Sequence, residues 1–281
     1  MRKAIHRAAV IVLDLWIEIR YRLTFALHRL DAKSETDIVI AMTSYPARVK
    51  HAWLALESLF RQDTDGYRVF LVLAESQFPA RRLPRMIRRL EKKGLGIIWT
   101  ARDGKSFDHL WPAYERFPRC SVISVDDDKF FSGSLVSTLR REAQSHPQKI
   151  IGWRGWEMRP AAKTVEFGVN WVRASPRTPS KKLFIPPGNG SLYPPGSLPA
   201  MTADHAVRER ICPNADDVWY WAMARLNGSE SLCLGLPNHR AVWRQSRTTA
   251  ISEIGPGPTE FANVVRHFKM LPSLRQDLDG A

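Results

Sequence analysis

The sequence predicts an α/β fold in which a mostly parallel, Rossmann-like sheet is flanked by helices. Residues 37–42, 67–73 and 121–125 are near-continuous apolar runs, the pattern of strands that are buried on both faces. Segments with helical spacing of apolar side chains separate these runs, and this alternation is typical of a parallel sheet. Several of the runs stop at polar residues, at the carboxyl edge where such sheets bind ligands.

Composition and charge allow a full core and indicate anionic partners. The chain of 281 residues is long enough for one large α/β domain or two small ones. Its net charge of +14 favours nucleic acid, anionic lipid or phosphorylated small molecules. Cys120, Cys212 and Cys233 are far apart and show no C-x-x-C spacing, which argues against a disulfide framework or zinc site and favours a reducing compartment.

Residues 1–30 contain no proline or glycine and are predicted to form a basic amphipathic helix. The longest stretch without a charge or histidine is residues 8–13, and about 20 apolar residues are needed to span a bilayer. On a helical wheel the polar side chains Lys3, Arg7, Asp14, Glu18, Arg22 and Arg29 oppose the apolar side chains Val10, Ile11, Leu13, Leu15, Ile17, Ile19, Leu23 and Leu27. Two interpretations stay open, a helix in a membrane interface or a helix packed on its own domain.

The first part of the chain carries the clearest alternation. A polar linker is expected at residues 31–37. Strands are predicted at 37–42, 67–73, 95–100 and 121–125, with helices at 51–62, 80–93 and 108–116. The helix at 80–93 is rich in arginine, and Pro84 fits its first turn.

The pattern is looser after residue 131. Helices are predicted at 133–144 and 218–226, strands at 149–153 and 232–236, a loop at 174–187, a tight turn at 188–195 and a tail at 271–281. Gly104-Lys105-Ser106 ends like a phosphate-binding P-loop but lacks the upstream glycine that the motif requires.

Three aspartates, Asp126, Asp127 and Asp128, follow the strand at 121–125 directly. Adjacent carboxylates repel one another, and near the interior of a fold they need a cation. Because residues i and i+2 of an extended segment share a face, Asp126 and Asp128 can point at one site. Mg²⁺ and Mn²⁺ prefer carboxylate oxygens and also bind phosphates, so a metal site is one interpretation. The other is a solvated acidic turn.

Four stretches occur in a fixed order along the chain. TSYPARVKHAWLALESLFRQ at 43–62 follows the first strand, the acidic run follows the fourth, and GNGSLYPP at 188–195 precedes ADDVW at 215–219. This combination resembles the GT-A glycosyltransferases, within the family-2-like bacterial enzymes that build surface polysaccharide. The resemblance covers residues 37–239 and implies a single GT-A domain at 37–270, with a nucleotide-binding half at 37–130 and an acceptor half at 131–270.

The resemblance also implies roles for individual residues. Asp126 and Asp128 match the D-x-D motif that holds Mn²⁺ or Mg²⁺ at the sugar-nucleotide diphosphate, with Asp128 as a direct ligand and His239, or alternatively His267, as a third. Contacts to the nucleotide-sugar are implied for Thr43, Tyr45, Arg48, Asp103, Lys105, Asp126 and Asp127. The loop beside the donor sugar and the acceptor is implied for Gly188, Asn189, Gly190 and Tyr193.

Asp216 and Asp217 match the acidic pair in which inverting members of this family place the catalytic base, and we assign that role to Asp217 in preference to Asp216. A carboxylate there would accept the proton of the attacking hydroxyl. The competing interpretation is that both carboxylates only stabilise the start of the helix that follows. The chain lacks the Q-x-x-R-W string of processive synthases, so transfer of a single sugar is expected.

The resemblance thus implies a metal-dependent enzyme that moves a sugar from a nucleotide-sugar donor to a glycan or lipid-linked acceptor. We expect a cytoplasmic protein. If residues 1–30 form an interfacial helix, the partner is the anionic inner face of the plasma membrane, and the alternative of a helix packed on its own domain stays open. A basic nucleic-acid-binding protein is an alternative because of the net charge, although no recognisable nucleic-acid module is present. A metal-dependent nucleotidyl or phosphoryl transferase on a similar sheet is another.

Overall fold

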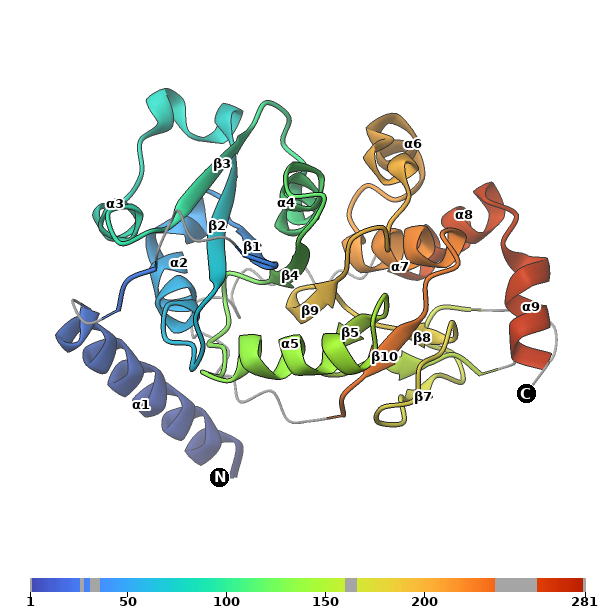
Figure 1. Cartoon of the computed structure of the whole chain (residues 1–281), viewed down its shortest axis with the longest axis horizontal. Helices are drawn as coiled ribbons and strands as arrows, with labels where there is room; N and C mark the ends of the chain where they lie inside the picture. The colour runs from blue at the N-terminus through green and yellow to red at the C-terminus, as the bar shows by residue number, and fades with distance from the viewer. Residues whose placement is uncertain (1, 26–27, 31–35, 160–165, 236–256, 280–281) are drawn as a thin grey trace.

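The computed structural model describes residues 2–25, 28–30, 36–159, 166–235 and 257–279 of the chain (Figure 1). Its centre is a seven-stranded sheet with the strand order β10-β5-β9-β4-β1-β2-β3. Its neighbouring strands pair in parallel except at β9, which is antiparallel to both β4 and β5. This confirms the predicted α/β class, a mostly parallel sheet flanked by helices.

The seven strands of the sheet are β1 (Ile38–Thr43), β2 (Tyr67–Ala74), β3 (Gly96–Thr100), β4 (Ser121–Val125), β5 (Ile150–Gly152), β9 (Asn189–Tyr193) and β10 (Ser231–Cys233). A smaller antiparallel sheet consists of β6 (Trp156–Glu157), β7 (Val172–Arg173) and β8 (Leu183–Phe184). The helices are α1 (Arg2–Leu23), α2 (Pro46–Leu59), α3 (Arg85–Glu91), α4 (Trp111–Arg116), α5 (Leu135–Ser145), α6 (His205–Ile211), α7 (Asp216–Leu226), α8 (Gly257–His267) and α9 (Leu271–Asp279).

The sheet separates two hydrophobic cores. Alternate side chains of β1 show this, since Ile38, Ile40 and Met42 join one core and Val39 and Ala41 join the other. Buried side chains of α2, α3 and α5 belong to the first core, and those of α4, α7 and α8 belong to the second. Because strands buried on both faces need apolar side chains at every position, the near-continuous runs of the sequence are explained.

The main difference from the sequence expectation is at residues 188–195, which were expected to form a tight turn. Residues Asn189–Tyr193 instead form β9, in the middle of the sheet. Its register against β4 shifts between Ser124 and Val125, and Gly190 lies at this bulge with a φ of +83°. A bulge residue in the left-handed region favours glycine, so this glycine supports a strand irregularity and not a turn.

Three predicted helices also have different bounds. Helix α2 begins at Pro46, five residues earlier than expected, because proline is well suited to the first helical position. The predicted helix at 80–93 is reduced to α3 after a short 3₁₀ turn at Pro79–Arg81, and Pro84 immediately precedes it. The predicted helix at 108–116 becomes a 3₁₀ segment, Lys105–His109, followed by α4.

The first and the last of the described helices both pack on the domain. Ile17, Tyr21 and Phe25 pack against the first core, so α1 and the residues after it contact the domain. Residues 271–279 form α9 where a tail was expected, because Leu274 is buried in the second core. None of the described helices combines the length and apolarity needed to cross a membrane.

Candidate functional site

An open pocket of about 1380 Å³ lies at the carboxyl edge of the sheet. Residues that follow β1, β3 and β4 line one side, and the start of α7 lines another. The predicted site residues that line it are Thr43, Tyr45, Arg48, Asp103, Lys105, Asp126, Asp127, Asp128, Gly188, Asn189, Asp216 and Asp217. Residues from five separate sequence stretches therefore meet in one cavity, which is large enough for a nucleotide-sized ligand.

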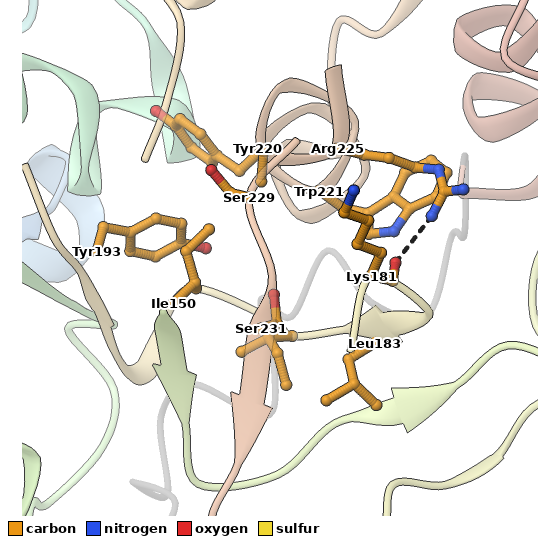
Figure 2. Close-up of a pocket in the computed structure, with 11 residues that line it drawn as sticks. Ile150, Lys181, Leu183, Tyr193, Tyr220, Trp221, Arg225, Ser229 and Ser231 are labelled. Carbon is orange, nitrogen blue, oxygen red and sulfur yellow. Dashed lines mark hydrogen bonds between the residues drawn. The ribbon is translucent and has the colours of Figure 1, made fainter. Parts of the chain in front are cut away.

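A second, much smaller cavity lies between β5, β10 and α7 (Figure 2). Ile150, Tyr193, Tyr220 and Ser231 are among its lining residues, and its volume is about 10 Å³. That is roughly the space needed by one water molecule, so this cavity is not a ligand site.

In the larger pocket, Asp127 and Asp128 are held by residues at the start of α2. The Ser44 hydroxyl donates to Asp127 Oδ2 at 2.6 Å, and Arg48 Nη2 lies 2.7 Å from Asp127 Oδ1 and 2.8 Å from Asp128 Oδ2. Burial raises the pKa of Asp127 to about 6, although the Arg48 charge acts in the opposite direction. Within the described part of the chain, Asp128 Oδ1 is buried without a hydrogen-bond partner.

Asp126 packs against the segment that leads into β9. Lys129 Nζ donates to the Asp126 carboxylate and, at 2.8 Å, to Asn189 Oδ1. The Asp126 amide donates to the Gly188 carbonyl at 2.9 Å. A Cβ at Gly188 would lie 1.9 Å from Asp126 Oδ1, so any larger residue there would displace the carboxylate.

The acidic run has donors of the right type for a hard divalent cation. Its carboxylate oxygens are the ligands that Mg²⁺ and Mn²⁺ prefer. Asp128 Oδ1 is buried without a hydrogen-bond partner among the described residues, whereas buried polar atoms normally have one. The described residues contain no cluster of three His, Cys, Asp or Glu side chains suited to a metal. The proposed third ligand His239 lies outside the described residues, and His267, at the end of α8, does not line the pocket.

Asp103 and Lys105 lie on the turn that follows β3. Gln77 Nε2 donates to Asp103 Oδ2 at 2.6 Å, and the Lys105 amide donates to Asp103 Oδ1 at 3.0 Å. Lys105 has a φ of +56°, a conformation that is costly for a residue with a Cβ. Its ammonium donates to Asn214 Oδ1 at 3.2 Å, so this lysine bridges the turn after β3 and the loop before α7.

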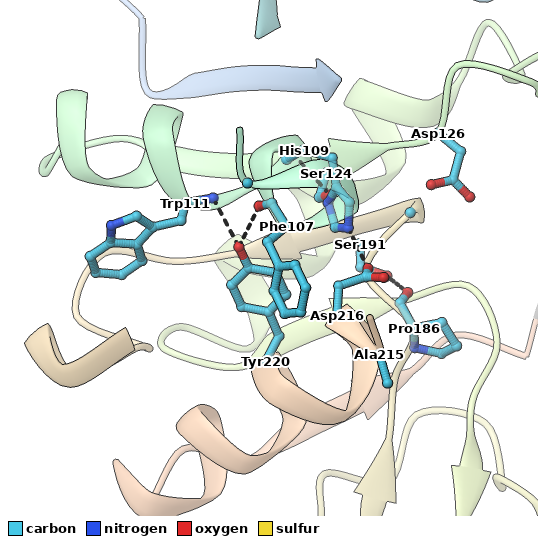
Figure 3. Close-up of polar contacts among 12 residues, drawn as sticks. Phe107, His109, Trp111, Ser124, Asp126, Pro186, Ser191, Ala215, Asp216 and Tyr220 are labelled. Carbon is cyan, nitrogen blue, oxygen red and sulfur yellow. Dashed lines mark hydrogen bonds and ion pairs between the residues drawn. The ribbon is translucent and has the colours of Figure 1, made fainter. Parts of the chain in front are cut away.

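A buried histidine that sequence reasoning missed connects β4 with α7 (Figure 3). His109 Nε2 donates to Asp216 Oδ2 at 2.6 Å, and its Nδ1 is hydrogen-bonded to the Ser124 hydroxyl. Burial alone would raise the pKa of Asp216, but the hydrogen bond and charge of His109 outweigh it and lower the pKa. Asp216 is therefore kept ionised and fixed in position.

Asp217 is in a different environment from its neighbour. Burial, followed by the charge of Asp216, raises the pKa of Asp217 to about 7. Both aspartates are in the first turn of α7, and Ala215 occupies the N-cap position. The loop before them is fixed by Glu260 of α8, whose carboxylate accepts from the amides of Asn214 and Ala215 at 3.1 and 2.7 Å.

Two predicted site residues do not reach the pocket. Tyr193 is 2% exposed and packs with its ring centroid 6.3 Å from that of Tyr220. A Cβ at Gly190 would lie 2.8 Å from Leu135 Cδ1, so this glycine faces the first core. Both belong to β9, where they lie on opposite faces of the sheet, Gly190 toward the first core and Tyr193 in the second.

Several pocket residues carried no clear signal in the sequence. Ser44, His109 and Lys129 form hydrogen bonds across the fold with residues 60 to 107 positions away in the sequence, although Lys129 also pairs with the nearby Asp126. One part of the remaining wall is aromatic and basic, and it includes Arg154, Trp156, Phe167, Trp171 and Phe184. Trp156 is visible in the sequence as part of W-R-G-W at 153–156, but nothing in the sequence placed it in the same pocket as the acidic run.

No family model and no curated protein matches this chain in sequence. Among solved structures, S. aureus TarS 1–349 aligns with a TM-score of 0.47 and 14% identity over 84% of this chain and 73% of that one. The same fragment with UDP-GlcNAc aligns with a TM-score of 0.45 and 14% identity over 70% and 55% of the two chains. Mannosyltransferase PcManGT from Pyrobaculum calidifontis, solved with GDP-Man and Mn²⁺, aligns with a TM-score of 0.42 and 14% identity over 83% and 64%. Likeness at this level does not assign the chain to a family.

Proposed function

We propose that this chain is a metal-dependent GT-A glycosyltransferase that moves a sugar from a nucleotide-sugar donor to a glycan or lipid-linked acceptor. The observation that supports it most is the convergence, in one pocket at the carboxyl edge of the sheet, of the acidic run with the Asp216–Asp217 pair. A donor diphosphate needs cations at one end of such a pocket, and the acceptor hydroxyl needs a base at the other.

The donor side of the pocket offers both signs of charge. Asp126 and Asp128 would hold the Mn²⁺ or Mg²⁺, which supplies charge neutralisation for the departing nucleoside diphosphate. Lys105, as a point charge on a flexible stem, would bind phosphate oxygens. Thr43, Tyr45 and Asp103 line the pocket nearby and would contact the nucleoside.

The Asp217 carboxylate is assigned the role of general base. A base is most effective when its pKa lies near the working pH, and the pKa of Asp217 is about 7. It would accept the proton of the acceptor hydroxyl as that oxygen attacks the anomeric carbon, which gives inversion. His109 acts as a positioning residue, because its hydrogen bond holds Asp216 and thereby the first turn of α7.

The acceptor side is assigned to the aromatic wall. Trp156 and Trp171 are partly exposed and line the pocket, and apolar walls with few polar groups are typical of ligand sites. Arg154, with its guanidinium carbon 5.5 Å from the Trp156 ring centroid, adds a positive charge there. We propose transfer of a single sugar in cell-surface polysaccharide synthesis on the cytoplasmic side of the membrane.

Calorimetric titration with a panel of nucleoside diphosphates and nucleotide-sugars tests this function. We expect one nucleotide to bind in Mn²⁺ and to bind at least tenfold more weakly in chelator, because the ion bridges protein and diphosphate. Asp128→Ala should lose the gain in nucleotide affinity that Mn²⁺ provides. The control is Asp63→Ala, a change at an exposed aspartate outside the pocket, which should bind like wild type. Absence of binding to any donor, with or without metal, would contradict the proposal.

A further inference from the structure

Helix α1 has an apolar face that the domain does not cover. Large apolar side chains that are 48–80% exposed lie on this helix, and they are Val12, Leu13, Leu15, Trp16, Ile19 and Leu23. Elsewhere in the described part of the chain, the exposed large apolar side chains are scattered singly, at Val169, Met201 and Leu226. Scattered residues of this kind need no explanation, whereas a contiguous patch marks an interaction site.

All of these exposed side chains except Leu13 form a single stripe, here called the α1 stripe and defined as Val12, Leu15, Trp16, Ile19 and Leu23. Their spacing of i, i+3, i+4, i+7 and i+11 puts them on one face of a helix. Residues on the opposite face, Ile17 and Tyr21, pack on the domain, and the ring centroids of Tyr21 and Phe130 are 6.1 Å apart. The helix is therefore anchored by one side while the other faces solvent, at one end of the molecule (Figure 1).

Basic residues lie beside the stripe and near the segment that follows α1. Arg20 lies beside it, with its guanidinium carbon 5.5 Å from the centroid of the Trp16 ring. The segment after α1 is bound to α3, since the Leu30 amide donates to the Lys93 carbonyl at 2.8 Å. Next to that contact, α3 and the residues before it form an open basic groove of about 860 Å³, lined by Arg82, Leu83, Arg85, Arg88, Arg89 and Lys92.

We propose that the α1 stripe docks on an anionic lipid bilayer, with the apolar side chains in the interface and the neighbouring arginines on the headgroups. An interfacial helix binds through its buried apolar area together with attraction to anionic lipid, and both are available here. A second copy of this chain is a poorer occupant, because each copy carries +14 and pairing through the stripe would bring equivalent arginines together. The proposal does not depend on the chemistry of the pocket.

Co-sedimentation of the full chain with vesicles tests the proposal. We expect binding to phosphatidylcholine vesicles that contain 30% phosphatidylglycerol, and at least fivefold weaker binding to pure phosphatidylcholine. Leu15→Glu/Ile19→Glu should bind the anionic vesicles at least tenfold more weakly, because two charges would enter the apolar interface. Leu226→Glu, at an exposed leucine on α7, is the matched control and should bind like wild type.

A second variant separates the charge contribution from the apolar one. Arg20→Gln should weaken binding to the anionic vesicles about fivefold and leave binding to neutral vesicles unchanged, since one basic residue near the surface is worth about a factor of five. Equal binding of wild type and the Leu15→Glu/Ile19→Glu variant would overturn the proposal. So would a wild-type dimer that the variant dissociates without any change in vesicle binding, because the stripe would then be an interface between copies.

Discussion

At the scale of single residues, the pocket carboxylates differ in their partners. Asp127 is paired with Arg48, and Asp216 is paired with His109. Asp128 Oδ1 has no hydrogen-bond partner among the described residues, and Asp217 has a pKa of about 7. We propose that Asp127 and Asp216 hold the site in shape and that Asp217 accepts the proton. Asp126 and Asp128 would bind the metal, although Lys129 is paired with Asp126 and Arg48 with the other oxygen of Asp128.

Because the pKa of Asp217 is raised, the stability of the fold is expected to depend on pH. Because the folded protein binds this proton more tightly than the unfolded chain, ionisation of Asp217 destabilises the fold once the pH exceeds the unfolded value of about 4. Asp217→Asn should therefore be more stable than wild type at pH 8, by about 2 kcal/mol given the partial exposure of the carboxylate, and the difference should vanish near pH 4. Urea unfolding at the two pH values measures this, and equal stabilities at pH 8 would contradict the environment described for Asp217.

At the scale of elements, the end of β4 and the start of β9 form one unit around Asp126. Gly188→Ala should weaken Mn²⁺-dependent nucleotide binding at least tenfold, because the new Cβ would lie 1.9 Å from Asp126 Oδ1 and displace the carboxylate. Gly196→Ala is a suitable control, since a Cβ there meets nothing within 4 Å, although its φ of +76° brings a strain of about 1 kcal/mol. Calorimetry on both variants checks this, and an unchanged affinity in Gly188→Ala would mean that Asp126 is not needed for binding.

Some of the helices and strands could be predicted from the sequence, and others could not. Strands β1, β2, β3 and β4 were located to within one residue. A strand buried on both faces, such as β1, β2 or β4, is apolar at nearly every position, and the edge strand β3 is a short apolar run as well. Strand β9 was missed, since Gly188, Gly190 and the following prolines favour a turn when read locally. Only its pairing with β4 and β5 makes it a strand. Helix α1 was assigned a single apolar face, whereas it presents one to the domain and another to solvent.

Some residues of the candidate site could likewise be predicted from the sequence, and others could not. The acidic run and the Asp216–Asp217 pair were identifiable because carboxylates at element boundaries carry a local signal. The link between His109 and Asp216 joins residues 107 apart in sequence, and no local pattern encodes it. Tyr193 and Gly190 were assigned to the site because GNGSLYPP resembles the loop beside the donor sugar and the acceptor. In the structure Tyr193 belongs to the second core, and Gly190 faces the first core.

At the scale of the whole molecule, the central position of β9 makes the two halves of the chain interdependent. Residues of the second half pair with β4 of the first half, so the sheet is continuous from β10 to β3. We expect one cooperative unfolding transition, with far-ultraviolet circular dichroism and tryptophan fluorescence giving the same midpoint in urea. A fragment of residues 37–130 should not fold, because β4 would expose an unpaired edge. Two separate transitions would contradict this view of a single unit.

If the pocket transfers a sugar, the donor releases its nucleoside diphosphate, and this release can be measured directly. After the calorimetric panel has identified the nucleotide, release is followed in Mn²⁺ with candidate glycan acceptors for wild type and Asp217→Asn. We expect release by the wild-type protein to depend on the acceptor, and its kcat/KM to fall about tenfold per pH unit below pH 7. In Asp217→Asn we expect kcat/KM to be lower by 10²-fold or more. Release of pyrophosphate or of the nucleoside monophosphate instead, or full activity in Asp217→Asn, would contradict it.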